Sequence, residues 1–428
     1  MVWTPPATVS VEQIRESSRG AEARAGEPID VEQYLFTIES LGLPWDIGGA
    51  IYQPRGPVAV GPDGKAVGVF LIHGGGGDHR GFDTMARLLA QGKGYRVVTI
   101  TYPGNLYLEG ETYDWPGDTF GDDGSIRTPM WKKGEAVTPD QYDLVEIKGD
   151  DVFRAKYGTL MFLKAHPGSR FFDRLAAWPM AYEDAFVEAC RRFLPAEDYS
   201  IYCSGVSTGG PFAHMILQRV ENIVGLVGAE SSPYGSIFSA MLDQGWPYDF
   251  DMMTVRTWRD VARYAGPEAG ADAGRRLPWL MEEVFEKHRA MTHRPLLKAQ
   301  HLVQFCATDA LERAAEASAA RLGLGEDATK ELKTRFAGYP FPLGGDARPV
   351  PPLLYSIMAN SRDHTFQRYD EILLPALARL DPAPKANIVR FDIGVHQYQA
   401  PLGDLPYGTA PAVADLWADA IDGGYYLP

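Results

Sequence analysis

The chain has 428 residues, and its 56 aspartates and glutamates outnumber its 41 lysines and arginines, which gives a formal net charge of −15. This acidic balance, without any run of basic residues, argues against nucleic acids and anionic membrane surfaces as partners. Three well-separated cysteines, Cys190, Cys203 and Cys306, do not form a disulfide or metal-ligand pattern, so we expect reduced core residues. The first residues show no basic region ahead of an apolar stretch, which predicts a cytoplasmic protein without a membrane span.

Residues 1–30 are predicted to form a peripheral N-terminal arm. Residues 10–24 are mostly charged or small and have only a weak helical period, and Gly26 and Pro28 end this pattern. A contact with a second copy of the chain, in a homodimer, is one role open to such an arm.

From residue 31 onward the chain alternates between strand and helix patterns. We expect strands at residues 34–39, 45–53, 67–72, 95–102, 199–203, 223–229, 351–358 and 386–393, and helices at 82–90, 181–193, 212–220, 368–380 and 412–421. Alternating units of this kind imply right-handed crossovers and a mainly parallel sheet. The expected α/β core therefore comprises residues 31–235 and 345–428.

Two long intervals interrupt this alternation. Residues 103–179 are rich in Gly, Asp, Pro and aromatic residues, which predicts loops and short helices that either serve the site or decorate the surface. Residues 236–344 are too long for a single crossover and have a largely helical composition.

The pentad Gly205-Val206-Ser207-Thr208-Gly209 follows a β-branched and aromatic run and precedes a helical pattern. A G-x-S-x-G sequence between a strand and a helix is the context of a nucleophile elbow, in which a sharp turn exposes the serine hydroxyl. Glycines are needed at both ends because a Cβ there would collide with the neighbouring strand and helix. Ser207 is therefore the candidate nucleophile.

A glycine run and a histidine flank this pentad in the sequence. His73 begins the run His73-Gly74-Gly75-Gly76-Gly77, which directly follows a buried-strand pattern, and its backbone N–H groups could face a developing oxyanion. His396 follows the last predicted strand and is the candidate general base. In this order of glycine run, serine, acid and histidine, the chain resembles the α/β-hydrolase family from about residue 33 to its end.

Two carboxylates compete for the role of the triad acid. Asp363 follows the strand after residue 350, at the position where the resemblance usually places this residue. Glu230 follows the strand after the elbow helix, where a smaller set of relatives keeps a glutamate. We favour Asp363 from the sequence. Because a carboxylate at the end of a buried strand is costly unless it is paired, Glu230 is expected to have a partner in either case.

The resemblance implies an α/β-hydrolase fold with an inserted helical cap at residues 236–344, whose aromatic residues either contact substrate or pack internally. Trp246, Tyr248 and Trp258 are the candidate substrate contacts. Thr208 and one of Gly75 and Gly76 would donate to the oxyanion.

The expected reaction is acyl transfer on a small ester or lactone with an apolar or aromatic part, without metal or organic cofactor. Cleavage of an amide, a peptide or a carbon–carbon bond by the same triad stays open. A ligand-binding member of the fold without turnover also stays open, because fold alone does not fix function.

Overall fold

The computed structural model describes the central sheet, most of its helices and the N-terminal arm. The described residues are 2–40, 43–74, 79–101, 103, 107–108, 111–112, 130–132, 135–136, 138–147, 160–166, 170–206, 209–217, 219–230, 316, 319–320, 323, 325–327, 329–330, 348–359, 369–378 and 380–428. The predicted cap at residues 236–344 thus lies almost entirely outside the described residues. No helix within the described ranges is long and apolar enough to cross a membrane.

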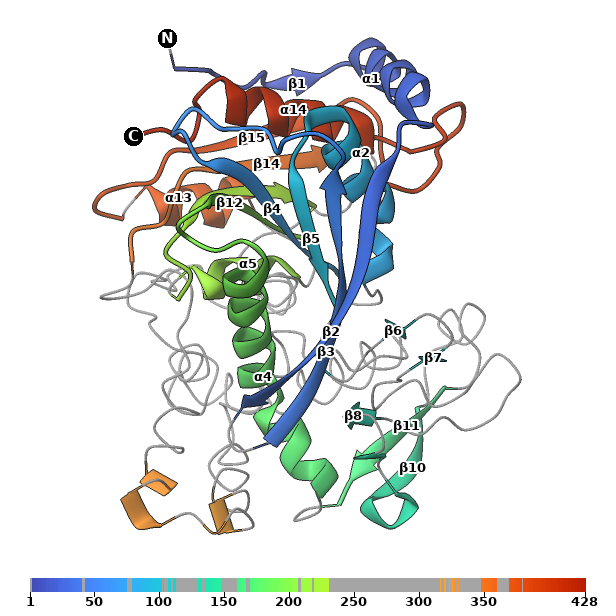
Figure 1. Ribbon diagram of the computed structural model, residues 1–428, viewed down its shortest axis with the longest axis vertical. Coiled ribbons are helices and arrows are strands. Elements are labelled where there is room, and N and C mark those ends of the chain that lie inside the picture. The colour runs from blue at the N-terminus through green and yellow to red at the C-terminus, as the bar shows by residue number, and fades with distance from the viewer. Residues whose placement is uncertain are drawn as a thin grey trace.

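A twisted sheet of nine strands forms the centre of the described part (Figure 1). From one edge to the other the strands are β1 (Thr8–Val9), β15 (Ala386–Phe391), β14 (Leu353–Met358), β13 (Ile223–Ala229), β12 (Tyr199–Gly205), β4 (Ala66–Ile72), β5 (Arg96–Ile100), β3 (Leu43–Pro54) and β2 (Ile29–Ser40). The pairs β2–β3 and β3–β5 are antiparallel and all the other pairs are parallel. The chain has an α/β-hydrolase fold, as the sequence predicted, with the strand before the serine at the middle of the sheet.

Helices cover both faces of this sheet (Figure 1). On one face, α1 (Val11–Arg24) and α2 (Asp83–Lys93) pack against α14 (Ala410–Asp422). On the other face, α4 (Arg170–Phe193) packs against α5 (Gly210–Ile216). The sheet is therefore buried on both sides, which is why its parallel strands read as continuous apolar runs and not as alternating patterns.

Strand β4 shows how the two layers share one strand. Val67, Val69 and Leu71 belong to the core cluster that contains α2 and α14. Phe70 points to the other face, where its ring lies 6.3 Å from that of Phe186 on α4. This alternation follows from the two-residue period of a strand.

Several boundaries differ from the sequence prediction. Helix α4 begins at Arg170 and not at residue 181. The predicted helix at residues 368–380 is instead a π-helical turn, η6 (Tyr369–Leu373), followed by the short helix α13 (Leu374–Leu377). Pro375 explains the break, because a proline has no N–H to donate to the carbonyl four residues earlier.

The described parts of residues 103–179 contain, in addition to the start of α4 and one short helical turn, short strand pairs that the prediction of loops and short helices did not include. The pairs are β6 (Tyr107–Leu108) with β7 (Glu111–Thr112), β8 (Met130–Lys132) with β9 (Glu135–Ala136), and β10 (Tyr142–Ile147) with β11 (Leu160–Ala165). The sequence of β10 contains the β-branched residues Val145 and Ile147, which favour a strand but are outnumbered by Gly, Asp and Pro in the composition of the whole interval. A 3-10 turn, η2 (Pro139–Gln141), precedes β10.

Candidate active site

The turn after β12 is held against the end of β4. The N–H of Val206 donates to Ile72 O at 3.1 Å, and the N–H of Gly209 donates back to Val206 O at 2.8 Å. A Cβ added at Gly205 would collide with the carbonyl of Gly209, and one at Gly209 would lie 2.6 Å from Ile72 O. Both glycines of the pentad are therefore required by close backbone contacts, for the reason that the sequence indicated.

The glycine run after β4 is anchored at both ends by a histidine. His73 is buried, and its Nδ1 lies 2.7 Å from Gly74 O; because a carbonyl can only accept, Nδ1 carries the proton. At the far end, the 3-10 turn η1 (His79–Phe82) begins with a buried histidine. The backbone N–H of His79 donates to Thr101 Oγ1 at 3.0 Å, and its Nδ1 lies 2.8 Å from the same oxygen. These contacts fix the described residues before and after the run, His73 at the end of β4 and His79 beside the end of β5.

Glu230 is the first residue after β13 and is completely buried. Its Oε1 accepts a hydrogen bond of 2.5 Å from the N–H of Met358, and its own N–H donates to Ser356 O at 3.0 Å. Its φ of 56° is the only positive φ of a non-glycine residue in the described part of the chain. A left-handed conformation costs about 1 kcal/mol for a residue with a Cβ, and strained residues of this kind cluster at functional sites.

His396 reaches this buried carboxylate from the loop after β15. Its Nδ1 lies 3.6 Å from Glu230 Oε2, while its side chain keeps 42% of its surface exposed. We expected from the sequence that a carboxylate at this buried position would have a partner. Its partners include the N–H of Met358 and the imidazole of His396. Since catalytic hydrogen bonds are often long in the absence of substrate, this separation suits a base and the carboxylate that orients it.

The loop that carries His396 is braced within itself and against β14, where Thr409 Oγ1 lies 3.1 Å from Met358 Sδ. The backbone N–H of Thr409 donates to Tyr398 O at 2.8 Å, and Gly394 has a φ of 134° that only glycine adopts easily. Tyr398 is buried, and its pKa is raised mainly by burial and further by the negative charge of Glu230. Neither Tyr398 nor the amide of Met358 stands out in the sequence, although both lie close to predicted features: Tyr398 is two residues after His396, and Met358 ends a predicted strand.

A further histidine, His214, is buried on α5, and its Nε2 lies 2.6 Å from the hydroxyl of Tyr355 on β14. Burial lowers the pKa of His214 to about 3. Together with Cys203, these two side chains line a small cavity below the turn after β12, of about 10 Å³ for a water-sized sphere.

Most of the other candidates lie outside the described residues. This holds for Ser207, Thr208, Gly75, Gly76, Asp363, Trp246, Tyr248 and Trp258. The described residues next to these candidates nevertheless lie at one edge of the sheet. They belong to four segments: the ends of β4, β12 and β13 and the loop after β15. In parallel sheets, ligands bind at this carboxyl edge.

Comparisons with known proteins give similarities of fold at low sequence identity. An esterase from the hyperthermophilic archaeon Pyrobaculum calidifontis is 16% identical with a TM-score of 0.40, covering 97% of this chain and 90% of the esterase. An esterase from the fungus Rhizomucor miehei is 14% identical with a TM-score of 0.37, and the match covers 99% of this chain and 94% of the esterase. A dienelactone hydrolase from Anabaena variabilis is 11% identical with a TM-score of 0.35, and the match covers 91% of this chain and 96% of the dienelactone hydrolase.

No protein-family model matches the sequence, and no curated protein does. Because the TM-scores lie below 0.5, the fold is assigned from the strand order and directions.

Proposed function

We propose that this protein is a serine hydrolase that cleaves a carboxylic ester or lactone, with Ser207 as the nucleophile and His396 as the general base. The observation that supports this most directly is the approach of His396 Nδ1 to the buried carboxylate of Glu230, at 3.6 Å. A serine hydroxyl needs a base within reach and a group that orients that base. Val206 of the glycine-bracketed turn bridges in parallel to Ala229, the residue directly before Glu230.

We propose Glu230, and not Asp363, as the acid of the triad. The contact with His396 and the hydrogen bond from the Met358 amide support this choice. A buried carboxylate that orients a histidine stabilises the imidazolium that forms during the reaction. Asp363 stays as the alternative, to be separated from Glu230 by mutation.

In the proposed mechanism, Ser207 Oγ attacks the substrate carbonyl while His396 Nε2 takes its proton. Nε2 has this role because Nδ1 faces the acid. The N–H of Thr208 and that of Gly75 or Gly76 stabilise the oxyanion. The imidazolium then gives its proton to the departing alcohol. In the second half, water attacks the acyl carbon while His396 takes its proton, and the imidazolium returns this proton to Ser207 Oγ as the bond from the serine to the carboxylic acid breaks.

The aromatic residues Trp246, Tyr248 and Trp258 support an apolar or aromatic group in the substrate. Aromatic side chains provide large apolar contact areas to small molecules. A panel of p-nitrophenyl esters of increasing acyl length, with lactones and anilides beside it, would define the preferred bond and chain length.

Intact-protein mass spectrometry with a serine-reactive fluorophosphonate tests the proposal. We expect one adduct on the wild-type chain, none on Ser207→Ala, and ester turnover that is lost with the adduct. Circular dichroism of Ser207→Ala should match that of the wild type, since one oxygen is removed. An adduct that persists in Ser207→Ala, or a wild-type chain with neither adduct nor turnover, would contradict the proposed nucleophile.

A further inference from the structure

The N-terminal arm adds a strand to the sheet beside the strand that leads to the candidate base. Strand β1 pairs in parallel with β15. The N–H of Arg390 donates to Ala7 O at 3.1 Å, and that of Asp392 donates to Val9 O at 3.0 Å. Asp392 is the first residue after β15 and lies four residues before His396. The arm thus holds the start of the histidine loop, residues 392–409.

Helix α1 fastens the arm to the same side of the molecule, where it lies along α14 (Figure 1). Its inward face consists of Ile14, Ser18 and Ala21, all buried. A capping box at its start pairs Ser10 with Gln13 through two reciprocal hydrogen bonds. Since α14 begins where the histidine loop ends, α1 also holds the element that closes this loop.

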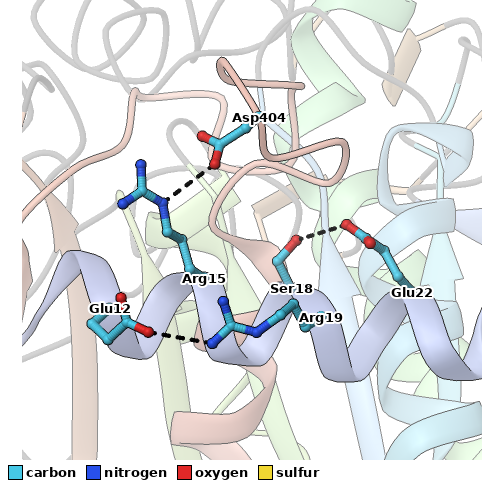
Figure 2. Close-up of polar contacts among 6 residues, drawn as sticks. All are labelled: Glu12, Arg15, Ser18, Arg19, Glu22 and Asp404. Atoms are coloured by element: carbon cyan, nitrogen blue, oxygen red, sulfur yellow. Dashed lines mark hydrogen bonds and ion pairs between the residues drawn. The ribbon is translucent and has the colours of Figure 1, made fainter.

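A third contact joins the arm to the middle of the loop. Figure 2 shows Arg15 reaching from α1 to Asp404, with its Nε 3.3 Å from Oδ2. One turn further along, Arg19 instead pairs with Glu12 of the same helix at 3.3 Å. The side chains of Arg15 and Asp404 are 46% and 70% exposed, so the pair contributes at most about 1 kcal/mol. The strand pairing and the packing of α1 therefore dominate.

From these three contacts we propose that the N-terminal arm is a positioning element for His396. It fixes the start, the middle and the end of the histidine loop against the sheet, and so sets the distance from His396 to Glu230. This role rests on the proposed function of His396. Misplacing a catalytic group by about 1 Å can lower the rate about 100-fold, so an anchor remote from the chemistry can control turnover.

The first test loosens α1 in the full-length chain with Ile14→Glu, which places a charge on its buried face. Ala23→Glu is the matched control, because it adds the same charge at an exposed position of the same helix. We expect kcat per fluorophosphonate-titrated site to fall about tenfold or more in Ile14→Glu, with KM little changed. Hydrogen exchange of residues 386–396 should quicken in the same variant and stay at the wild-type rate in Ala23→Glu.

Titration of the active sites separates positioning from stability, because a purely structural role lowers the number of folded sites and leaves kcat per site unchanged. An unchanged kcat per site with unchanged exchange at residues 386–396 would overturn the proposal. Hydrogen exchange is read without any substrate. If the wild-type chain forms no adduct, the proposed function fails while the anchoring of the loop is still measured.

A second pair of variants covers the case in which Ile14→Glu does not fold. Arg15→Ala removes the contact with the loop, whereas Arg19→Ala removes only a contact within the helix. We expect faster hydrogen exchange at residues 396–405 in Arg15→Ala alone, with a decrease in kcat of about twofold to fivefold. Equal exchange rates in the two variants would count against the proposal.

Discussion

His396 and His214 lie at opposite extremes of environment within one fold. His396 has a half-exposed ring whose Nδ1 is 3.6 Å from the buried carboxylate of Glu230. His214 is buried on α5 and its Nε2 lies 2.6 Å from the hydroxyl of Tyr355. A carboxylate stabilises an imidazolium, whereas the neutral hydroxyl of a buried tyrosine does not offset the cost of burying the positive charge.

The pKa of His214, lowered by burial to about 3, keeps its ring neutral near neutral pH. It can therefore serve as a fixed hydrogen-bonding link between α5 and β14, and not as a group that gains and loses a proton during turnover. The partner and the solvent exposure, more than the residue type, decide which histidine can act as a base.

The largest effect is expected from His396→Ala. Loss of the base should lower ester turnover by about 10⁴-fold or more, because removal of a triad histidine leaves only binding and the oxyanion donors. His214→Phe should retain most of its turnover per titrated site. Turnover of His214→Phe is measured per titrated site, and that of His396→Ala per mole of folded protein, because the fluorophosphonate reacts only with a serine activated by its base. Similar losses in both variants would contradict the comparison.

Glu230→Gln is expected to have the next largest effect. The amide keeps the shape of the side chain but removes the charge that stabilises the imidazolium, so kcat should fall about 10³-fold to 10⁴-fold. Asp363→Asn is the comparison, with little effect on kcat. The reverse ranking of the two variants would assign the acid to Asp363 and leave Glu230 as a buried structural carboxylate.

The positions of the main strands along the chain and the glycine-bracketed turn could be predicted from the sequence, because both depend on local patterns. Buried parallel strands give apolar runs such as residues 67–72 and 223–229, and close backbone contacts require Gly205 and Gly209. Strand β1 could not be found in this way, because two residues carry no periodicity and the pairing partner lies at the other end of the chain.

The pairing of His396 with Glu230 was also beyond the sequence. Glu230 and Asp363 each follow a predicted strand, and the sequence ranking favoured Asp363. What brings Glu230 to the ring is its left-handed backbone and its bond from the Met358 amide, and neither has a local pattern.

A smaller effect is expected from Gly394→Ala, which tests how firmly the histidine loop is shaped. A Cβ at this position would lie 2.7 Å from Sδ and 3.0 Å from Cβ of Met358, in a backbone conformation that alanine resists. We expect a loss of about 2 kcal/mol in stability and a lower kcat per site, since His396 is two residues away.

Gly403→Ala is the matched control for this variant. Gly403 lies on the same loop with a φ of 60°, and nothing lies within 4 Å of an added Cβ. Its replacement should cost about 1 kcal/mol for the left-handed conformation and leave kcat per site unchanged. Urea unfolding measures the stability of both variants, and kcat per titrated site measures their activity. An equal loss of kcat in Gly394→Ala and Gly403→Ala would show that the close contact with Met358 does not determine the position of His396.

The last effect concerns stability alone, with no change expected in turnover near neutral pH, and comes from His214. Its pKa is about 3 in the folded chain and about 6.5 when unfolded. The unfolded state therefore binds a proton below pH 6.5 while the folded state does not. The contribution of His214 to stability is complete above pH 6.5 and is lost as the pH falls towards 3, by about 1 kcal/mol per pH unit.

His214→Phe should remove this pH dependence. Leaving the Tyr355 hydroxyl without its partner costs about 1 to 3 kcal/mol, but this cost does not depend on pH because burial raises the pKa of Tyr355 and keeps it protonated. Urea unfolding of wild type and variant at pH 7.5, 6 and 5 should give a stability difference that shrinks as the pH falls. A difference that stays constant over this range would mean that His214 can bind a proton in the folded chain, and the contrast with His396 would then rest on the carboxylate alone.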